Sequence, residues 1–281
     1  MPYLLALLSA VFYGAADFIG GLAARRAHTF AVVVVSGCGG LAVLAILLAV
    51  MPEASPTRHD FIWGGVAGFA GGIGVGLLYY ALAIGTMSVV APVTAVCGVG
   101  LPVVAGLLLG DRPSMLTLAG MALAIVAIVL VGQERRASGS GLQASGSAIG
   151  IALAAGVAIG FFYLALANVS ADAGLWPLLS ARLASVVFYS LVVVFTGRSL
   201  RMEAPVARLV ISGGALDMVA NALYILAMHG GLLSVVVVLS ALYPAATVVL
   251  ARIELHERLS RLQLAGVMGA LVAVAMIVGG A

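Results

Sequence analysis

The chain is built from long apolar runs that short polar breaks separate. Runs bounded by charge, proline or glycine predict helices near 3–24, 29–50, 61–84, 87–109 and 115–132, and then near 148–168, 174–196, 207–229, 232–252 and 261–280. An α-helix needs about 20 apolar residues to cross a bilayer, and each run supplies roughly that number. The pattern therefore predicts an all-α integral membrane protein with ten transmembrane helices.

The composition supports this interpretation. Of the 281 residues, 64% are hydrophobic and 8% are charged, and the mean hydropathy is +1.25. Soluble domains carry about a quarter charged residues, so the polar residues here are too few to cover a surface that faces water. A soluble enzyme and a secreted disulfide scaffold are excluded. Both cysteines, Cys38 and Cys97, fall in apolar runs and indicate neither a disulfide nor a metal site.

One polar stretch divides the chain into related halves. Residues 134–147 read ERRASGSGLQASGS, which predicts a flexible linker. The halves on either side of it, 1–133 and 148–281, match each other without a gap when the sequence is shifted by 146 residues. The matched residues include Gly68, Leu77, Ala81 and Gly85 with Gly214, Leu223, Ala227 and Gly231, and Arg112, Ser114 and Leu118 with Arg258, Ser260 and Leu264. We therefore predict a tandem duplication of a five-helix unit.

An odd number of helices makes the second unit enter the membrane from the opposite side. The prediction is thus two inverted five-helix repeats around a central cavity, an arrangement that many secondary transporters share. All thirteen basic residues are arginines; ten lie in or beside odd-numbered loops, and two, Arg58 and Arg112, lie in even-numbered loops. The positive-inside rule places the odd-numbered loops in the cytoplasm and both termini outside. We read the first run as a retained span, and the dispersed arginines indicate no nucleic-acid partner.

Two stretches resemble a known family. Residues 7–27 read LLSAVFYGAADFIGGLAARRA, and the turns at 110–120 and 256–266 read GDRPSMLTLAG and HERLSRLQLAG. They resemble the drug/metabolite transporter superfamily, specifically its EamA-type ten-helix exporters, although Asp111 and Pro113 depart from the family's turn. The resemblance covers the whole chain. It implies export of amino acids, other metabolites or drugs, with the aromatic amino-acid and metabolite exporters as a possible subgroup.

The same turns have a local structural interpretation. Ser114 and Ser260 are suited to cap the helices that follow them. The carboxylates of Asp111 and Glu257 stand beside these caps, where negative charge favours a helix N-terminus.

Three charged residues lie inside predicted spans: Asp17, Arg182 and Asp217. A charge at the centre of a span costs about 2.5–3.5 kcal/mol on insertion scales, so such residues mark functional sites. Their repeat partners are Tyr163, Ser36 and Gly71, so the charges are not duplicated. Arg182 can bind a substrate carboxylate, or it can neutralise Asp17 or Asp217. Asp17 is either a site residue or a group that reaches the membrane interface or caps a neighbouring helix.

Other polar and aromatic residues are candidates for the cavity wall. Asp217, Asn221 and Tyr224 share one helix face and form either a cavity stripe or an interhelical clasp. The ridge of Gly64, Gly68, Gly72 and Gly76 either packs tightly or walls the cavity, with Tyr80 facing inward. Aromatic faces are available from Tyr13, Tyr79, Tyr163 and Trp176. Pro92, Gly98, Gly100, Pro102 and Pro244 lie inside the fourth and ninth spans and are predicted gate or hinge residues.

The chain lacks the motifs of ATP-driven transport and of common hydrolases, including Walker A, HExxH and GxSxG. We therefore predict that it is not an enzyme and needs no cofactor or metal. The function expected is export of small metabolites, above all amino acids, by a secondary transporter in the bacterial cytoplasmic (inner) membrane. Protons are a candidate coupling ion, and a monomer is expected. The alternatives are export of lipophilic cations or drugs, or a non-transporting membrane subunit or lipid-handling partner.

Overall fold

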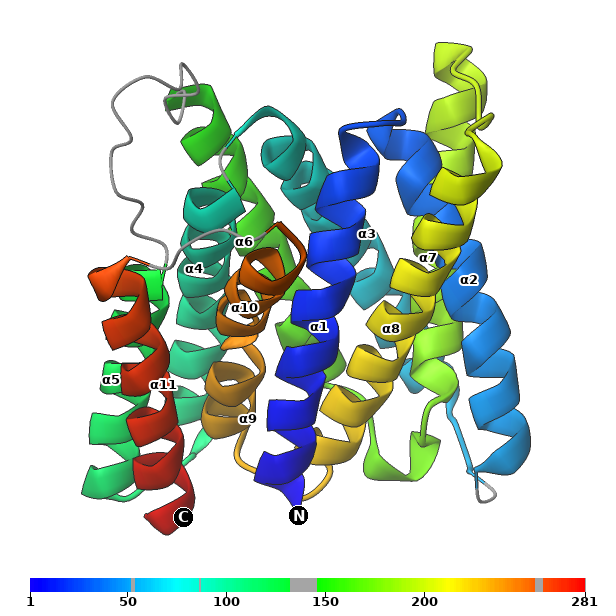
Figure 1. Cartoon of the computed structure of the whole chain (residues 1–281). Coiled ribbons are helices and arrows are strands. Elements are labelled where there is room, and N and C mark those ends of the chain that lie inside the picture. Colours follow the sequence, from blue (N-terminus) through cyan, green and yellow to red (C-terminus); the bar gives the residue numbers. More distant parts are fainter. Residues whose placement is uncertain (52–53, 86, 132–145, 256–259, 281) are drawn as a thin grey trace.

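The computed structural model describes residues 1–51, 54–85, 87–131, 146–255 and 260–280, and this part of the chain is helical (Figure 1). The first half contains α1 (Pro2–Ala24), α2 (Thr29–Val50), α3 (Arg58–Ile84), α4 (Met87–Leu109) and α5 (Met115–Val131). The second contains α6 (Gly146–Leu166), a short 3₁₀ turn η1 (Ala171–Ala173), α7 (Trp176–Thr196), α8 (Ala204–Met228), α9 (Leu233–Ser240), α10 (Tyr243–Leu255) and α11 (Arg261–Gly279). The predicted linker lies outside the described residues except for its last two, which open α6.

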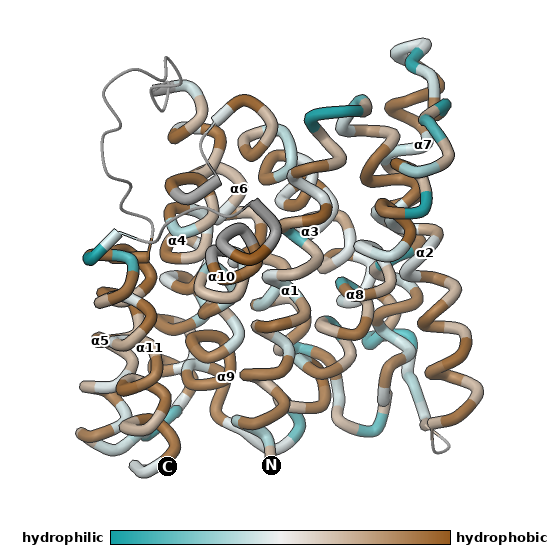
Figure 2. Tube along the Cα trace, in the orientation of Figure 1, coloured by the Kyte–Doolittle hydropathy of each residue, from teal (hydrophilic) through white to brown (hydrophobic). Residues whose placement is uncertain are grey.

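The all-α membrane architecture is confirmed. Eight helices in the described part of the chain are long and apolar enough to cross a membrane. The other two crossings are α5, which has 17 residues, and the pair α9 and α10 taken together. Figure 2 shows hydrophobic residues along the length of the helices and hydrophilic ones gathered toward their ends. Large apolar side chains such as Leu108 and Phe195 are more than 80% exposed, as expected for a surface that faces lipid.

The third helix begins three residues before its predicted start. The side chain of Thr57 accepts a hydrogen bond from the backbone N–H of Asp60, and Asp60 Oδ2 accepts one from the Thr57 N–H at 2.8 Å. This capping box satisfies two backbone donors that a helix start would otherwise leave free. The helix therefore extends into a polar segment that hydropathy alone assigns to a loop.

The span predicted at 232–252 is not one continuous helix, because the chain breaks between α9 and α10, just before the Pro244 that indicated a possible break. Pro244 is the second residue of α10. It has no N–H, and its ring cannot pack against the carbonyl four residues earlier, so α9 cannot continue through it. By contrast, α4 runs unbroken through Pro92 and Pro102, where the sequence also indicated an interruption.

The two halves interlock through equivalent helix pairs. Extensive packing joins α1 to α8 and the equivalent pair α6 to α3, and it joins α2 to α8 and the equivalent pair α7 to α3. The α5 and α11 helices pack against each other, as equivalent helices at a twofold axis would. In Figure 1, α1 and α6 run in opposite directions, as do α2 and α7. This arrangement supports the predicted inverted repeat.

Individual contacts recur at the 146-residue offset. A side chain on Gly68 would strike the backbone of Ala181, and one on the equivalent Gly214 would strike the backbone of Ser36. These contacts are the close crossings of α3 with α7 and of α8 with α2. Hydrogen bonds follow the same rule: Thr94 Oγ1 donates to the Ala152 carbonyl at 3.1 Å, and Ser240 Oγ donates to the Ala6 carbonyl at 3.4 Å.

Candidate functional site: a charged cavity between the halves

A cavity of about 90 Å³ lies at the centre of the bundle where the two halves meet. Seven helices contribute to the wall of this central cavity: α1, α2, α3, α6, α7, α8 and α10. The residues that line it are Tyr13, Asp17, Val33, Ser36, Gly68, Gly71, Gly72, Val75, Leu78, Tyr79, Ile159, Phe162, Tyr163, Leu178, Ala181, Arg182, Ser185, Asp217, Met218, Asn221 and Tyr243. It has room for several waters or a small organic solute.

The charged residues of the cavity stand at equivalent positions of the two halves. In each of three pairs both members line the cavity, and in each only one member is charged. The pairs are Asp17 with Tyr163, Arg182 with Ser36, and Asp217 with Gly71. Equivalent positions of the two halves thus face the same cavity with different chemistry, as the unduplicated charges predicted.

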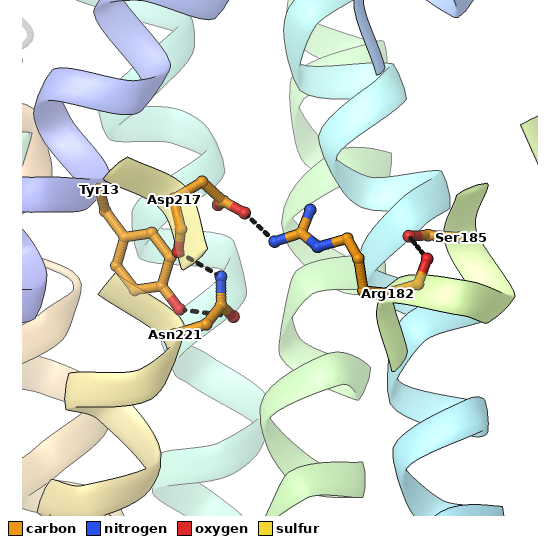
Figure 3. Close-up of polar contacts among 5 residues, drawn as sticks. All are labelled: Tyr13, Arg182, Ser185, Asp217 and Asn221. Carbon is orange, nitrogen blue, oxygen red and sulfur yellow. Dashed lines mark hydrogen bonds and ion pairs between the residues drawn. The ribbon is translucent and has the colours of Figure 1, made fainter. Parts of the chain in front are cut away.

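Arg182 and Asp217 form an ion pair in this wall (Figure 3). The arginine extends from α7, and the aspartate belongs to α8; each side chain is 15% exposed. Gly40 on α2 makes room for the guanidinium, because a Cβ at that position would lie 3.2 Å from Arg182 Nε. Of the two carboxylates that the sequence offered as partners, the structure pairs Arg182 with Asp217.

Tyr13, Asn221 and Asp217 are joined by hydrogen bonds beside this pair (Figure 3). The Tyr13 hydroxyl donates to Asn221 Oδ1 at 3.1 Å, and Asn221 Nδ2 donates to the backbone carbonyl of Asp217 at 2.7 Å. Asn221 therefore links α8 to α1 through a hydrogen bond and also lines the cavity. Both interpretations of the face that carries Asp217 and Asn221, a cavity stripe and an interhelical clasp, thus apply to Asn221. Because Tyr13 has donated its proton, its oxygen presents lone pairs to the cavity.

Asp17 is the second carboxylate of the cavity. It is 9% exposed and therefore does not reach the membrane interface, which was one of the expectations for it. Within the described part of the chain its carboxylate has no hydrogen bond and no ion pair. The cavity thus holds one paired and one unpaired acid.

The rings of Tyr163 and Tyr224 pack against each other in a tilted arrangement, with centroids 4.7 Å apart and an interplanar angle of 44°. Tyr163 lines the cavity, whereas Tyr224 is fully buried behind it and is not part of the wall. Tyr224 therefore supports the ring of Tyr163. Its hydroxyl has no hydrogen-bond partner among the described residues.

The prediction that Tyr80 faces the cavity is wrong. Tyr80 is 47% exposed and absent from the wall, while its neighbour Tyr79 is 2% exposed and lines it. With about 3.6 residues per turn, each step of four residues rotates about 40° further around the helix, so the glycine ridge drifts away from the cavity. Tyr79 lies eleven residues, about three turns, beyond Gly68 and shares its face.

Several wall residues were not singled out from the sequence. Tyr243 opens α10 directly after the helix break, and its hydroxyl donates to the Ala91 carbonyl at 3.4 Å. Its position next to Pro244, a proline inside a predicted span, could have marked Tyr243 as a candidate in the sequence. Ser36, Ser185 and Phe162 also line the cavity; Ser36 was noted only as the repeat partner of Arg182.

The predicted gate or hinge residues lie outside the cavity wall. Pro92, Gly98, Gly100 and Pro102 belong to α4, and Pro244 belongs to α10. A Cβ on Gly98 would lie 3.3 Å from the Gly156 carbonyl, whereas one on Gly100 would meet nothing within 4 Å. Gly98 therefore allows α4 to approach α6 closely, and a gating role for the group stays a prediction.

The N-terminal caps predicted for two helices are present. The N–H of Thr117 donates to Ser114 Oγ at 3.2 Å, and the N–H of Gln263 donates to Ser260 Oγ at 3.1 Å. Asp111 does not act on the helix next to it. Its Oδ2 accepts a hydrogen bond from the Ser234 N–H at 2.8 Å, in the first turn of α9. Glu257 lies outside the described residues.

A helical membrane bundle with a charged cavity between its halves is the architecture of a solute transporter. Residues 1–133 match the model of the EamA-like transporter family. The predicted EamA resemblance is thereby confirmed, and with it the coarse function of a membrane transporter of small molecules. The aromatic amino-acid subgroup stays a prediction.

A solved crystal structure has the same overall fold as this chain. The likeness has a TM-score of 0.71 at 16% sequence identity and covers 98% of this chain and 95% of that one. At this identity it bears on the fold alone. No curated protein matches the chain in the comparison made.

Proposed function

We propose that the protein is a secondary transporter that exports small metabolites, with amino acids as its substrate class. The observation that carries the proposal is the ion pair between Arg182 and Asp217 in the wall of the central cavity. A guanidinium binds a carboxylate through two parallel hydrogen bonds, and Asp217 or Asp17 binds an ammonium group. An amino-acid zwitterion therefore supplies a partner for each member of the pair.

The ion pair also separates this proposal from export of lipophilic cations. A cation that takes Asp217 leaves the Arg182 guanidinium without a partner, and an uncompensated charge in a partly buried site is costly. A zwitterion replaces both charges at once and keeps the cavity neutral. The rings of Tyr79, Phe162 and Tyr163 in the wall would then pack against the substrate side chain.

Alternating access between two inverted five-helix repeats, 1–133 and 148–281, is the mechanism proposed. The equivalent crossings at Gly68 and Gly214 allow one half to pivot on the other about the cavity. The break before Pro244 and the prolines of α4 are the proposed gates. A single chain closes the cavity, so a monomer is the proposed functional unit.

Protons are the coupling ion that we propose for export. Asp217 already has the charge of Arg182 beside it, whereas Asp17 lines the same cavity with no partner in the described residues. Asp17 is therefore the group proposed to bind the proton.

The proposed location is the bacterial cytoplasmic membrane, with the odd-numbered loops inside. Arg25 and Arg198 follow the ends of α1 and α7, away from the N-terminus in Figure 1. Labelling of intact cells with a membrane-impermeant maleimide tests this orientation. In a variant without native cysteines, Ala171→Cys should react and Ser199→Cys should not; the opposite result would reverse the orientation.

The proposed function is tested by counterflow into proteoliposomes. The vesicles are loaded with one amino acid and diluted into a labelled panel of aromatic, branched, hydroxy and basic amino acids, plus one lipophilic cation. Accumulation of an amino acid above protein-free vesicles supports the proposal. Accumulation of the cation alone would favour drug export. Silence across the panel with folded protein would favour a non-transporting subunit.

A further inference from the structure

A second cavity lies at the membrane face that carries the N-terminus, beside the end of α2, the start of α7 and the end of α8. It measures about 440 Å³, and six of the residues that line it are Leu48, Met51, Asp172, Leu175, Trp176 and Leu226. We call it the vestibule. None of its wall residues belongs to the central cavity, so it is a separate space.

Hydrogen bonds fix the loop that carries Asp172 in the wall of the vestibule. The N–H of Ser55 donates to the Asp172 carbonyl at 2.8 Å, which ties the segment after α2 to η1. Asp60 Oδ1 accepts a hydrogen bond from the Ser170 N–H at 2.8 Å, which anchors the other side of η1 to α3. Gly174 then adopts a φ of 55°, a conformation that other residues rarely adopt, and the chain turns into α7. The segment from Ser170 to Gly174 is therefore held by hydrogen bonds on both sides and forms one wall of the vestibule.

The chemistry of the wall selects for positive charge. Asp172 is its acid and Trp176 its aromatic ring, and the described wall contains no arginine or histidine. An indole face attracts a cation through its quadrupole, and a carboxylate attracts one by charge. Leu48, Leu175 and Leu226 provide an apolar surface beside them.

We propose that the vestibule is a second binding site, which takes a small organic cation: an ammonium group with an apolar substituent. The ammonium lies between Asp172 and Trp176, and the substituent lies on the leucines. The site differs from the central cavity in having no cationic side chain in its described wall, so it has no group for a carboxylate.

The neighbouring histidine does not remove this selectivity. His229 directly follows the last residue of α8. Burial lowers the pKa of His229 below its usual value, and this effect outweighs the charge of the nearby Asp172 carboxylate, which favours the protonated imidazole. It is therefore mainly neutral at neutral pH and leaves the charge of Asp172 uncompensated.

The vestibule lies one helical turn from the central cavity along α7. Leu175 lines the vestibule and Leu178 lines the central cavity, and both are 2% exposed. A solute that moves between this membrane face and the central cavity would pass this pair. This role in a pathway rests on the proposed transport function, whereas binding in the vestibule does not.

The protein contains two tryptophans, Trp63 and Trp176, so the Trp63→Phe variant carries one reporter in the vestibule. Its fluorescence is titrated, in purified full-length protein, with three probes that share a phenyl ring: phenethylammonium, phenylalanine and phenylacetate. We expect a saturable change with phenethylammonium, none with phenylacetate, and apparent affinity at least about fivefold weaker after Asp172→Asn. Glu203→Gln, which removes an exposed acid at the other end of α8, is the matched control and should change nothing.

Two further variants distinguish binding in the vestibule from binding in the central cavity. Trp176→Phe with Trp63 retained should abolish the signal, and Arg182→Ala should leave the phenethylammonium affinity unchanged. Equal responses to all three probes, no response to the cation, or indifference to Asp172→Asn would overturn the proposal. Loss of the signal in Arg182→Ala would do so as well, since the probe would then report on the central cavity. Because the readout is binding, a failure of transport leaves this test intact.

Discussion

Arg182 on α7 and Asp217 on α8 form an ion pair in the wall of the central cavity, and their equivalents in the first half are Ser36 and Gly71. The pair thus sits on a nearly twofold scaffold without being duplicated by it. An enclosed ion pair contributes little to stability on its own, because desolvation offsets much of the attraction. Its place in the cavity wall is more informative than its strength.

The pair should show energetic coupling. Arg182→Ala and Asp217→Ala should each lower the free energy of unfolding by about 1–3 kcal/mol, because each leaves a charge unpaired. The double variant should lose less than the sum of the two, with a coupling of about 0.5–3 kcal/mol. Unfolding in detergent measures all three, with exposed Arg201→Ala as a control that stays within about 0.5 kcal/mol. Strict additivity would mean that the two residues do not interact in the folded protein.

Tyr13 should matter for transport and Tyr80 should not. Tyr13→Phe leaves Asn221 Oδ1 without its donor and removes an oxygen from the cavity, so transport should fall about tenfold, the effect of roughly 1.4 kcal/mol. Tyr80→Phe removes the same atom from an exposed ring and is the matched control. Initial counterflow rates compare the two variants. Equal losses, or no loss in Tyr13→Phe, would argue against the cavity as the substrate site.

The glycine crossings should tolerate no side chain. Gly68→Ala and Gly214→Ala each place a Cβ into backbone of the facing helix, so each should destabilise by about 3 kcal/mol or prevent folding. Gly65→Ala is the control, because a Cβ there meets nothing within 4 Å. It should be neutral or stabilising by up to about 1 kcal/mol, given the higher helix propensity of alanine. If Gly65→Ala destabilises the protein as much as Gly68→Ala does, α3 does not cross α7 at Gly68 as described.

The loop between α1 and α2 should make stability depend on pH. Burial and the charge of Arg198 lower the pKa of His28 below its usual value near 6.5, and His28 Nδ1 accepts a hydrogen bond from the Phe30 N–H. The unfolded chain then binds the proton more readily. The stabilising contribution is therefore complete above the usual pKa and is lost as pH falls through the lowered one.

Thermal unfolding between about pH 7.5 and pH 5 measures this effect. The His28→Asn variant keeps a helix-capping side chain and should show a smaller drop in melting temperature on acidification than the parent. Burial also lowers the pKa of His229. His229 should therefore add its own contribution to the drop in melting temperature, and His229→Asn should remove that contribution. An unchanged pH profile in both variants would exclude these histidines as its source.

The helices were predictable because each apolar run matches the thickness of a bilayer. For seven of the ten predicted ranges, both ends fall within two residues of the helix in the structure. The start of α3 was missed because the Thr57 capping box lies in a polar segment, where hydropathy gives no signal. Proline was an ambiguous marker: the chain breaks before Pro244 but not at Pro92 or Pro102. Whether a helix breaks at a proline or continues through it depends on tertiary packing, which the local sequence does not reveal.

The charged residues of the cavity were predictable because a charge inside a span is costly and therefore rare. Asp17, Arg182 and Asp217 all line the central cavity. Which acid pairs with Arg182 depends on how α1, α7 and α8 are rotated about their own axes relative to one another. No pattern in the sequence predicts these rotations. The confusion of Tyr79 with Tyr80 has the same origin, since adjacent residues differ by about 100° around a helix.

The most direct test of the account is counterflow of a transported amino acid by the parent protein and by Arg182→Ala, reconstituted at equal density. The account predicts that Arg182→Ala loses accumulation of the labelled amino acid, because its carboxylate has no guanidinium to bind, while Arg198→Ala on the exposed loop retains it. Accumulation in Arg182→Ala at the parental rate, with the parental preference for carboxylate-bearing solutes, would contradict the central claim.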